Sequence, residues 1–173
     1  MTKKARIYLF IPLILLTALL CDGLIASVFS NQLYTATSDM VPRLIIICLI
    51  VFSFCVDRHY MILFGILFGL LYDSYYVGIL GLYTSLFPVI IYLSDKLRKI
   101  LNPNLLVLVL ILIIQISLSE TVLYGFYSVI DLTAIDFSVF LANRLGPTLL
   151  LNSVFLLVLY YPLKKTALAI MQD

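Results

Sequence analysis

The run Leu105–Ile130, LLVLVLILIIQISLSETVLYGFYSVI, carries a single charged side chain, Glu120, in an otherwise almost wholly apolar segment. A helix needs about 20 apolar residues to cross the hydrocarbon core of a bilayer, so this run is long enough. Its apolar residues are continuous rather than alternating, which indicates a helix and not a strand of a barrel. The segment therefore predicts a membrane-spanning helix with a charge inside it.

The composition of the whole chain also indicates a membrane protein. Of its 173 residues, 64% are hydrophobic and 12% are charged, and the mean hydropathy is +1.16. A soluble domain is about half apolar and about a quarter charged, and a disordered chain has low hydrophobicity. The net charge of +2 is too small to indicate a nucleic-acid-binding surface. We expect one integral membrane domain over residues 1–173.

Six apolar runs separated by short polar segments predict an all-α bundle of six transmembrane helices. The runs are Ile7–Phe29, Val41–Val56, Tyr60–Tyr76, Gly78–Leu93, Leu105–Ile130 and Phe137–Leu163. The polar segments Ser94–Asn104 and Asp131–Asp136 are predicted to be loops. The second and third runs are short, and a re-entrant hairpin in that region is the alternative.

The basic residues orient this bundle, because lysine and arginine gather on the cytoplasmic side of a membrane protein. With the N-terminus in the cytoplasm, nine of the 11 basic side chains fall on the cytoplasmic side. The other two, Arg43 and Arg144, fall on the outer side. We expect a multi-pass protein of the plasma membrane with both termini in the cytoplasm.

Ionisable residues are predicted inside four spans, where each costs at least about 2.5–3.5 kcal/mol. They are Asp22, Asp73, Glu120 and Arg144. At 1.5 Å per residue, Asp22 and Glu120 lie at similar heights, about 22 Å from the cytoplasmic ends of their helices. Each charge lies on the small or polar stripe of its helix, which faces neighbouring helices rather than lipid.

Two interpretations of the polar set Asp22, Glu120, Arg144 and Asn152 stay open. In the first, Asp22 or Glu120, or both, pairs with Arg144 in a pocket on the outer side that holds a ligand or relays protons. In the second, these groups form structural pairs that fix the register of the helices.

The sequence contains no motif for catalysis, for a cofactor or for a metal. Cys21, Cys48 and Cys55 lie in apolar runs and are expected to behave as small hydrophobic residues. The single histidine, His59, lies beside Arg58 in a short charged turn, and one histidine alone does not make a catalytic metal site. We expect no enzyme activity and no cofactor; a lipid-modifying enzyme with Glu120 and Asp22 as acid and base is a minor alternative.

Glycines mark the third predicted span and the turn after it. Gly65 and Gly69 lie four residues apart on one helix face that continues to Asp73, and Gly78 and Gly81 bracket the turn. Small residues at this spacing let two helices approach closely. The stripe is interpreted either as packing within the chain or as a surface for a partner helix.

The segment Gly65–Tyr83, GILFGLLYDSYYVGILGLY, resembles the rod shape-determining protein MreD family. Members of that family are small six-span proteins whose third helix ends in Gly-Leu-Leu-x-Asp, followed by Leu-Gly-Leu-Tyr. These motifs are Gly69–Asp73 and Leu80–Tyr83 in this chain, and Ile79 stands where the family often has proline. The similarity in length and topology covers nearly the whole chain.

The resemblance implies a helix arrangement similar to the substrate-binding subunits of energy-coupling-factor vitamin transporters. It also implies a non-enzymatic scaffold of lateral peptidoglycan synthesis and rod shape, beside an MreC-like single-span protein, the actin-like MreB where present, RodA and a class B transpeptidase. By this likeness, Gly69–Tyr83 is the candidate functional or partner surface. The alternative is a substrate-binding subunit of a micronutrient transporter, with its ligand in the pocket of Asp22, Glu120 and Arg144.

Overall fold

The computed structural model describes residues 3–101 and 104–171, and its regular elements are helices. The α-helices are α1 (Lys3–Val28), α2 (Ser30–Leu33), α3 (Leu44–Ser53), α4 (Arg58–Tyr72), α5 (Leu82–Arg98), α6 (Leu105–Val129), α7 (Phe137–Phe140) and α8 (Gly146–Met171). Two π-helical turns, η1 (Asp73–Val77) and η2 (Leu141–Leu145), continue α4 and precede α8. The predicted all-helical class is confirmed.

Within the described residues, four segments are long and apolar enough to cross a membrane: Ile7–Val28, Arg58–Val77, Leu105–Val129 and Phe137–Ala169. The predicted count of six spans is not confirmed by this measure. The runs predicted as the second and fourth spans form helices α3 and α5, of only 10 and 17 residues. At 1.5 Å per residue, α3 is about 15 Å long, half the thickness of the hydrocarbon core.

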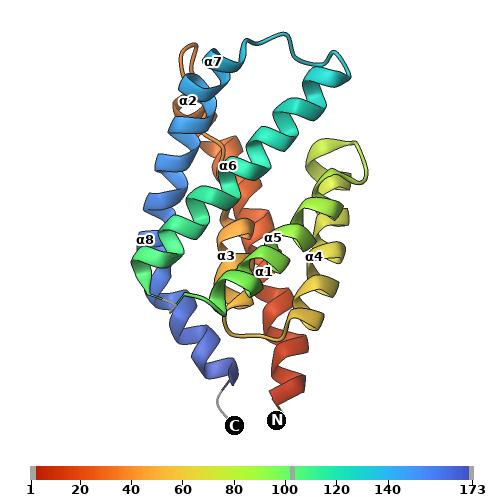
Figure 1. Ribbon diagram of the computed structural model, residues 1–173, viewed down its shortest axis with the longest axis vertical. Helices are drawn as coiled ribbons and strands as arrows, with labels where there is room; N and C mark the ends of the chain where they lie inside the picture. Colours follow the sequence, from red (N-terminus) through yellow and green to blue (C-terminus); the bar gives the residue numbers. More distant parts are fainter. Residues whose placement is uncertain (1–2, 102–103, 172–173) are drawn as a thin grey trace.

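Helix α3 forms the centre of the bundle (Figure 1). Every one of its residues, Leu44–Ser53, is buried. It packs against α1, α4, α5, α6 and α8. Before it, residues 34–43 run without helix from the end of the bundle where α2 lies, closed by an isolated β-bridge between Tyr34 and Asp39. This connection carries the N-terminus of α3 into the protein interior.

The loop predicted over Ser94–Asn104 is wrong in its first half, because α5 extends through Arg98. Ser94 and Asp95 are buried. Asp95 forms ion pairs with Arg98 at 3.0 Å and with Lys99 at 3.3 Å, one turn further along the helix. Such pairs support the last turn of a helix, so these charges continue the helix rather than end it.

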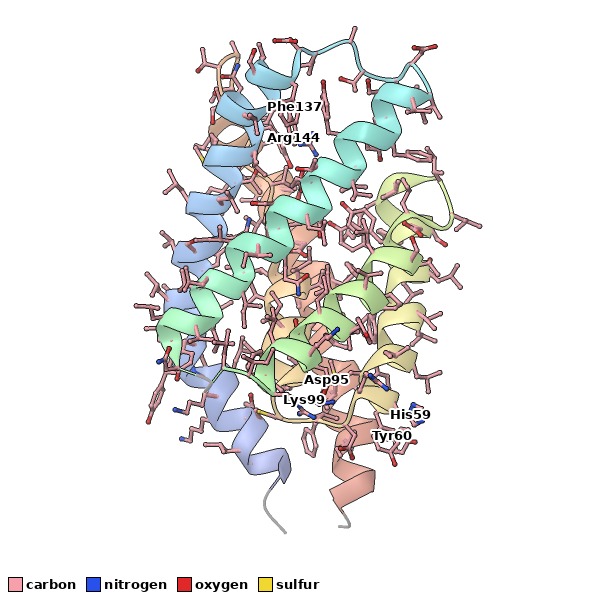
Figure 2. The ribbon with its side chains drawn as sticks, viewed as in Figure 1. His59, Tyr60, Asp95, Lys99, Phe137 and Arg144 are labelled. Carbon is pink, nitrogen blue, oxygen red and sulfur yellow. The ribbon has the colours of Figure 1, made fainter. Side chains whose placement is uncertain are left out.

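The start of α1 and the end of α8 lie at the same end of the bundle (Figure 1). His59, Asp95 and Lys99 lie at this end, and Phe137 and Arg144 lie at the opposite end (Figure 2). The Arg58 guanidinium and the Lys96 ammonium both lie against the ring of Tyr92, 5.7 and 6.0 Å from its centroid. We call the end that holds His59, Asp95 and Lys99 the terminal end, and the end that holds Phe137 and Arg144 the far end.

Candidate functional site: a buried polar cluster and a helical hairpin

Glu120 of α6 lies at the centre of a buried ionic cluster. Its Oε1 accepts hydrogen bonds from Nη2 of Arg43 at 2.5 Å and from Nε of Arg43 at 3.0 Å. Its Oε2 accepts from Nε of Arg144 at 3.1 Å. The Glu120 side chain is 1% exposed and that of Arg43 is 5% exposed, whereas that of Arg144 is 38% exposed. One carboxylate therefore joins the start of α3, helix α6 and η2.

Arg43 is the residue of this cluster that the sequence-based reasoning missed, since from the sequence it counts only as a basic residue on the outer side of the membrane. Instead, the side chain is buried, and its Nη1 donates to the hydroxyl of Tyr72 at 2.9 Å. Its guanidinium also lies 5.2 Å from the centroid of the Tyr83 ring, within the range of a cation–π contact. The available signal was that Arg43 lies inside the apolar run Val41–Val56.

Asp22 of α1 does not pair with Arg144. Its Oδ1 accepts from the backbone N–H of Leu44 at 2.6 Å, and its Oδ2 accepts from that of Ile45 at 3.2 Å. The first N–H groups of a helix have no partner inside the helix, so Asp22 caps α3 from a different helix. A carboxylate at this position also interacts favourably with the helix dipole.

Asn152 and Thr148 of α8 hold the connection that leads into α3. The side chain of Asn152 accepts from the backbone N–H of Arg43 at 2.8 Å and donates to the carbonyl of Val41 at 2.8 Å. The Thr148 hydroxyl accepts from the N–H of Val41 at 3.1 Å. Both side chains are fully buried. The polar stripe of α8 thus satisfies backbone groups that would otherwise be buried without partners.

The segment that carries the family motif forms a tight hairpin between α4 and α5. Asp73 accepts hydrogen bonds from the N–H groups of Gly81, Tyr83 and Thr84 at 2.9, 2.8 and 3.1 Å, and from the Thr84 hydroxyl at 2.8 Å. Gly78 and Gly81 adopt φ angles of +74° and +110°, which L residues with a Cβ rarely adopt. The motif therefore caps α5 and sets the turn before it.

The glycine stripe of α4 faces α5 of the same chain. A Cβ on Gly69 would lie 2.5 Å from the carbonyl oxygen of Tyr83 and 2.6 Å from Cα of Thr84. A Cβ on Gly65 would lie 2.5 Å from Cδ1 of Ile91. Of the two interpretations, the structure shows packing within the chain, and α5 covers the surface that a partner helix would need.

Two cavities flank the Glu120 cluster. The first, of about 590 Å³, lies between residues 35–39, α6, the 132–135 segment and α7, and is lined by Glu120 and Arg144 among others. The second, of about 310 Å³, is lined by Asp22, Arg43 and Tyr83 among others. Within the described residues, no group of three His, Cys, Asp or Glu side chains is placed to hold a metal ion.

A family model described as rod shape-determining protein MreD matches residues 3–167 of the chain. The rod shape-determining protein MreD of Bacillus subtilis is 28% identical over 154 residues, which cover 89% of this chain and 90% of that protein. The cell shape-determining protein MreD of Streptococcus pneumoniae is 23% identical over 163 residues, which cover 94% of this chain and 96% of that protein. No solved structure matches significantly. The family model spans nearly the whole chain, so the resemblance is confirmed: the chain belongs to the rod shape-determining protein MreD family.

Proposed function

We propose that the chain is a non-enzymatic membrane scaffold of the cell-elongation machinery, which places peptidoglycan synthesis along the lateral wall. Its membership in a cell shape-determining family supports this role. The observation that carries it is the use of the buried carboxylates. Asp22, Asp73 and Glu120 each accept hydrogen bonds at both oxygens from donors of the same chain. These groups hold helices and turns in place, which is what a scaffold requires.

The proposed topology has six segments in the plasma membrane and both termini in the cytoplasm. Helices α3 and α5 would be the two short segments, with α3 shielded from lipid on all sides by the other helices. The basic side chains at the terminal end support a cytoplasmic location for that end. Labelling single cysteines at Lys165 and Thr133 in a cysteine-free variant tests this, since only position 133 should react with an impermeant reagent outside the cell.

The proposed partner is an MreC-like single-span protein, with RodA and a class B transpeptidase as further members of the complex. Because α5 covers Gly65 and Gly69, a partner helix must dock on a face that is still free. The outward face of α1 is one continuous apolar surface of half-exposed residues, formed by Leu9, Leu13, Leu16, Leu20 and Leu24. The outward face of α8 is similar, with Leu150, Val154, Leu157, Val158 and Tyr161.

Photo-crosslinking in cells that express an MreC-like protein tests the proposed function. A photoreactive residue is placed in turn at the exposed positions of α1 and α8, and at the buried Ile47 of α3 as a control. We expect crosslinks from neighbouring positions of one helix face and none from Ile47, together with loss of rod shape when the chain is depleted. Rod shape that persists after depletion would contradict the proposal, as would a complete absence of crosslinks at levels where the protein is folded.

The second candidate is the substrate-binding subunit of a micronutrient transporter, which the cavity of about 590 Å³ beside Glu120 and Arg144 favours. Cavities of about 300–1,000 Å³ are typical of small-molecule sites. Thermal unfolding of the purified protein in the presence of vitamins separates the two functions. A specific shift of several degrees for one vitamin, without retention of an MreC-like partner, would support the transporter subunit.

A further inference from the structure

The larger cavity presents both donors and acceptors of hydrogen bonds that the protein itself does not pair. Arg144 bonds to Glu120 through Nε only, and within the described residues its two terminal amino groups make no hydrogen bond. The Asp39 carboxylate, the Asn143 amide and the Thr37 hydroxyl likewise make no hydrogen bond or ion pair with any described residue. All of these side chains line the cavity except that of Glu120, which lines it with its charge already paired. A ligand that fits must both donate and accept.

The main chain, and not these side chains, holds the groups together. The backbone N–H of Asp39 donates to the carbonyl of Asn143 at 2.6 Å, which fastens the 35–39 turn to η2. Asn143 and Arg144 both belong to η2, which is a π-helical turn. Such turns are rare and are frequently found at functional sites. The donors and the acceptor are therefore fixed side by side while their side chains stay free for a ligand.

The charges around the cavity cancel. Asp39, Glu120 and Arg144 line it, and Arg43 lies behind Glu120, with Nη2 at 2.5 Å from Oε1. Two carboxylates thus face two guanidinium groups. A charged ligand would lose its hydration here without meeting an excess of the opposite charge, which is costly. The balance favours a neutral ligand.

The remaining wall of the cavity is apolar and aromatic. Leu123, Tyr124, Tyr127 and Phe140 line it, and the rings of Tyr124 and Phe140 are stacked at a centroid distance of 4.5 Å. The volume of about 590 Å³ lies within the range of small-molecule sites. A pyranose sugar combines what this lining asks for, because its hydroxyl groups both donate and accept and the C–H groups of its ring faces pack against apolar surface.

We propose that this cavity binds a neutral sugar ring. The Asp39 carboxylate accepts from sugar hydroxyls, the terminal amino groups of Arg144 and the Asn143 amide donate to sugar oxygens, and the ring packs toward Tyr124. The site rests on the proposed topology only for the side of the membrane from which the sugar arrives, and it does not depend on the scaffold role. The shared chemistry is a pyranose, either free or as the head group of a lipid.

Equilibrium dialysis of the purified full-length chain against labelled sugars tests the proposal. The chain is held in phosphatidylcholine nanodiscs, which contain no sugar, whereas maltoside detergents would compete. The neutral probes are glucose, galactose and N-acetylglucosamine. Glucosamine and glucuronate, at mildly acidic pH, keep the ring and add a positive or a negative charge. We expect one neutral sugar bound per chain and weaker binding of both charged sugars. Glucosyl diacylglycerol in the nanodisc should displace the labelled sugar if the source is a lipid, and should leave it bound if the source is the free sugar.

Asp39→Ala is the main variant, since the carboxylate bonds to none of the described residues and its loss should leave the unfolding temperature unchanged. It should bind the neutral sugar about tenfold or more weakly, the value of lost hydrogen bonds to a charged group. Asp57→Ala is the matched control, because Asp57 is an exposed carboxylate before α4 that does not line the cavity. If Asp39→Ala proves unstable, Thr37→Val removes a second lining hydroxyl and should weaken binding several-fold. The proposal is overturned if no neutral sugar binds, if a charged sugar binds as tightly, or if both variants bind like the wild type.

Discussion

Glu120 and Asp73 are both buried carboxylates in the half of the bundle toward its far end, yet their hydrogen-bond partners are of different kinds. Glu120 lies between the guanidinium groups of Arg43 and Arg144. Among the described residues, the donors to Asp73 are all neutral: three backbone N–H groups and one hydroxyl. The ionic cluster joins elements that are far apart in the sequence, whereas the Asp73 cap joins two helices that follow each other. The first fixes the tertiary arrangement and the second fixes a local turn.

The largest expected effect comes from breaking the ionic cluster. Glu120→Ala leaves the buried guanidinium of Arg43 without its counter-charge, and removing one member of a buried ion pair costs about 3–5 kcal/mol. We expect a strongly lowered unfolding temperature or a loss of folded protein, measured by fluorescence-detected size exclusion with heating.

A double variant separates charge from packing in this cluster. Arg43→Met combined with Glu120→Gln removes both charges of the closest pair and should recover much of the stability lost in either single variant. If the double variant is as unstable as the sum of the two single variants, the pair is not what holds α3 to α6.

The Asp73 cap should be the next most sensitive feature. Asp73→Ala leaves the N–H groups of Gly81, Tyr83 and Thr84 without their acceptor, and each buried donor left unpaired costs about 1–3 kcal/mol. Because water can reach part of this turn, we expect a total loss of about 2–3 kcal/mol, measured by steric trapping or by denaturant unfolding in micelles. Asp73→Asn keeps one acceptor oxygen and should lose less. Equal stability of Asp73→Ala and the wild type would show that the cap is dispensable.

The two glycines of α4 predict different costs for the same substitution. In Gly69→Ala the new Cβ meets backbone atoms of Tyr83 and Thr84, which cannot move without displacing α5. In Gly65→Ala it meets the end of the Ile91 side chain, which can rotate away. We expect a loss of about 1–3 kcal/mol for Gly69→Ala and a clearly smaller loss for Gly65→Ala, in the same unfolding assay. The reverse order would mean that α4 and α5 pack differently.

The sequence was sufficient to place the charges on helices but not to identify their partners. The depth and face of Asp22, Glu120 and Arg144 follow from counting residues along a helix, and Glu120 does meet Arg144. Asp22, however, caps the backbone of α3. Every residue except proline has a backbone N–H, so the sequence does not indicate which one a carboxylate will bond. The apolar run Val41–Val56 likewise does not reveal that its helix, α3, has only 10 residues and lies wholly in the interior. For this reason the sequence does not show that Arg43, at the start of α3, is buried.

The turn between α4 and α5 offers the smallest and most local test of the comparison. Gly81 has φ +110°, and a Cβ added to it would meet no atom within 4 Å, so Gly81→Ala tests backbone strain alone, without a steric clash. An L residue in the left-handed region costs about 1–2 kcal/mol. Gly125→Ala is the matched control, because Gly125 lies in α6 with open space around it and no left-handed backbone. We expect Gly81→Ala to lower the stability by about 1 kcal/mol and Gly125→Ala to leave it unchanged or slightly raised, since alanine favours the helix. If both variants unfold at the same temperature, the left-handed turn is not what allows Asp73 to reach the start of α5, and the local half of the comparison fails while the ionic half stands.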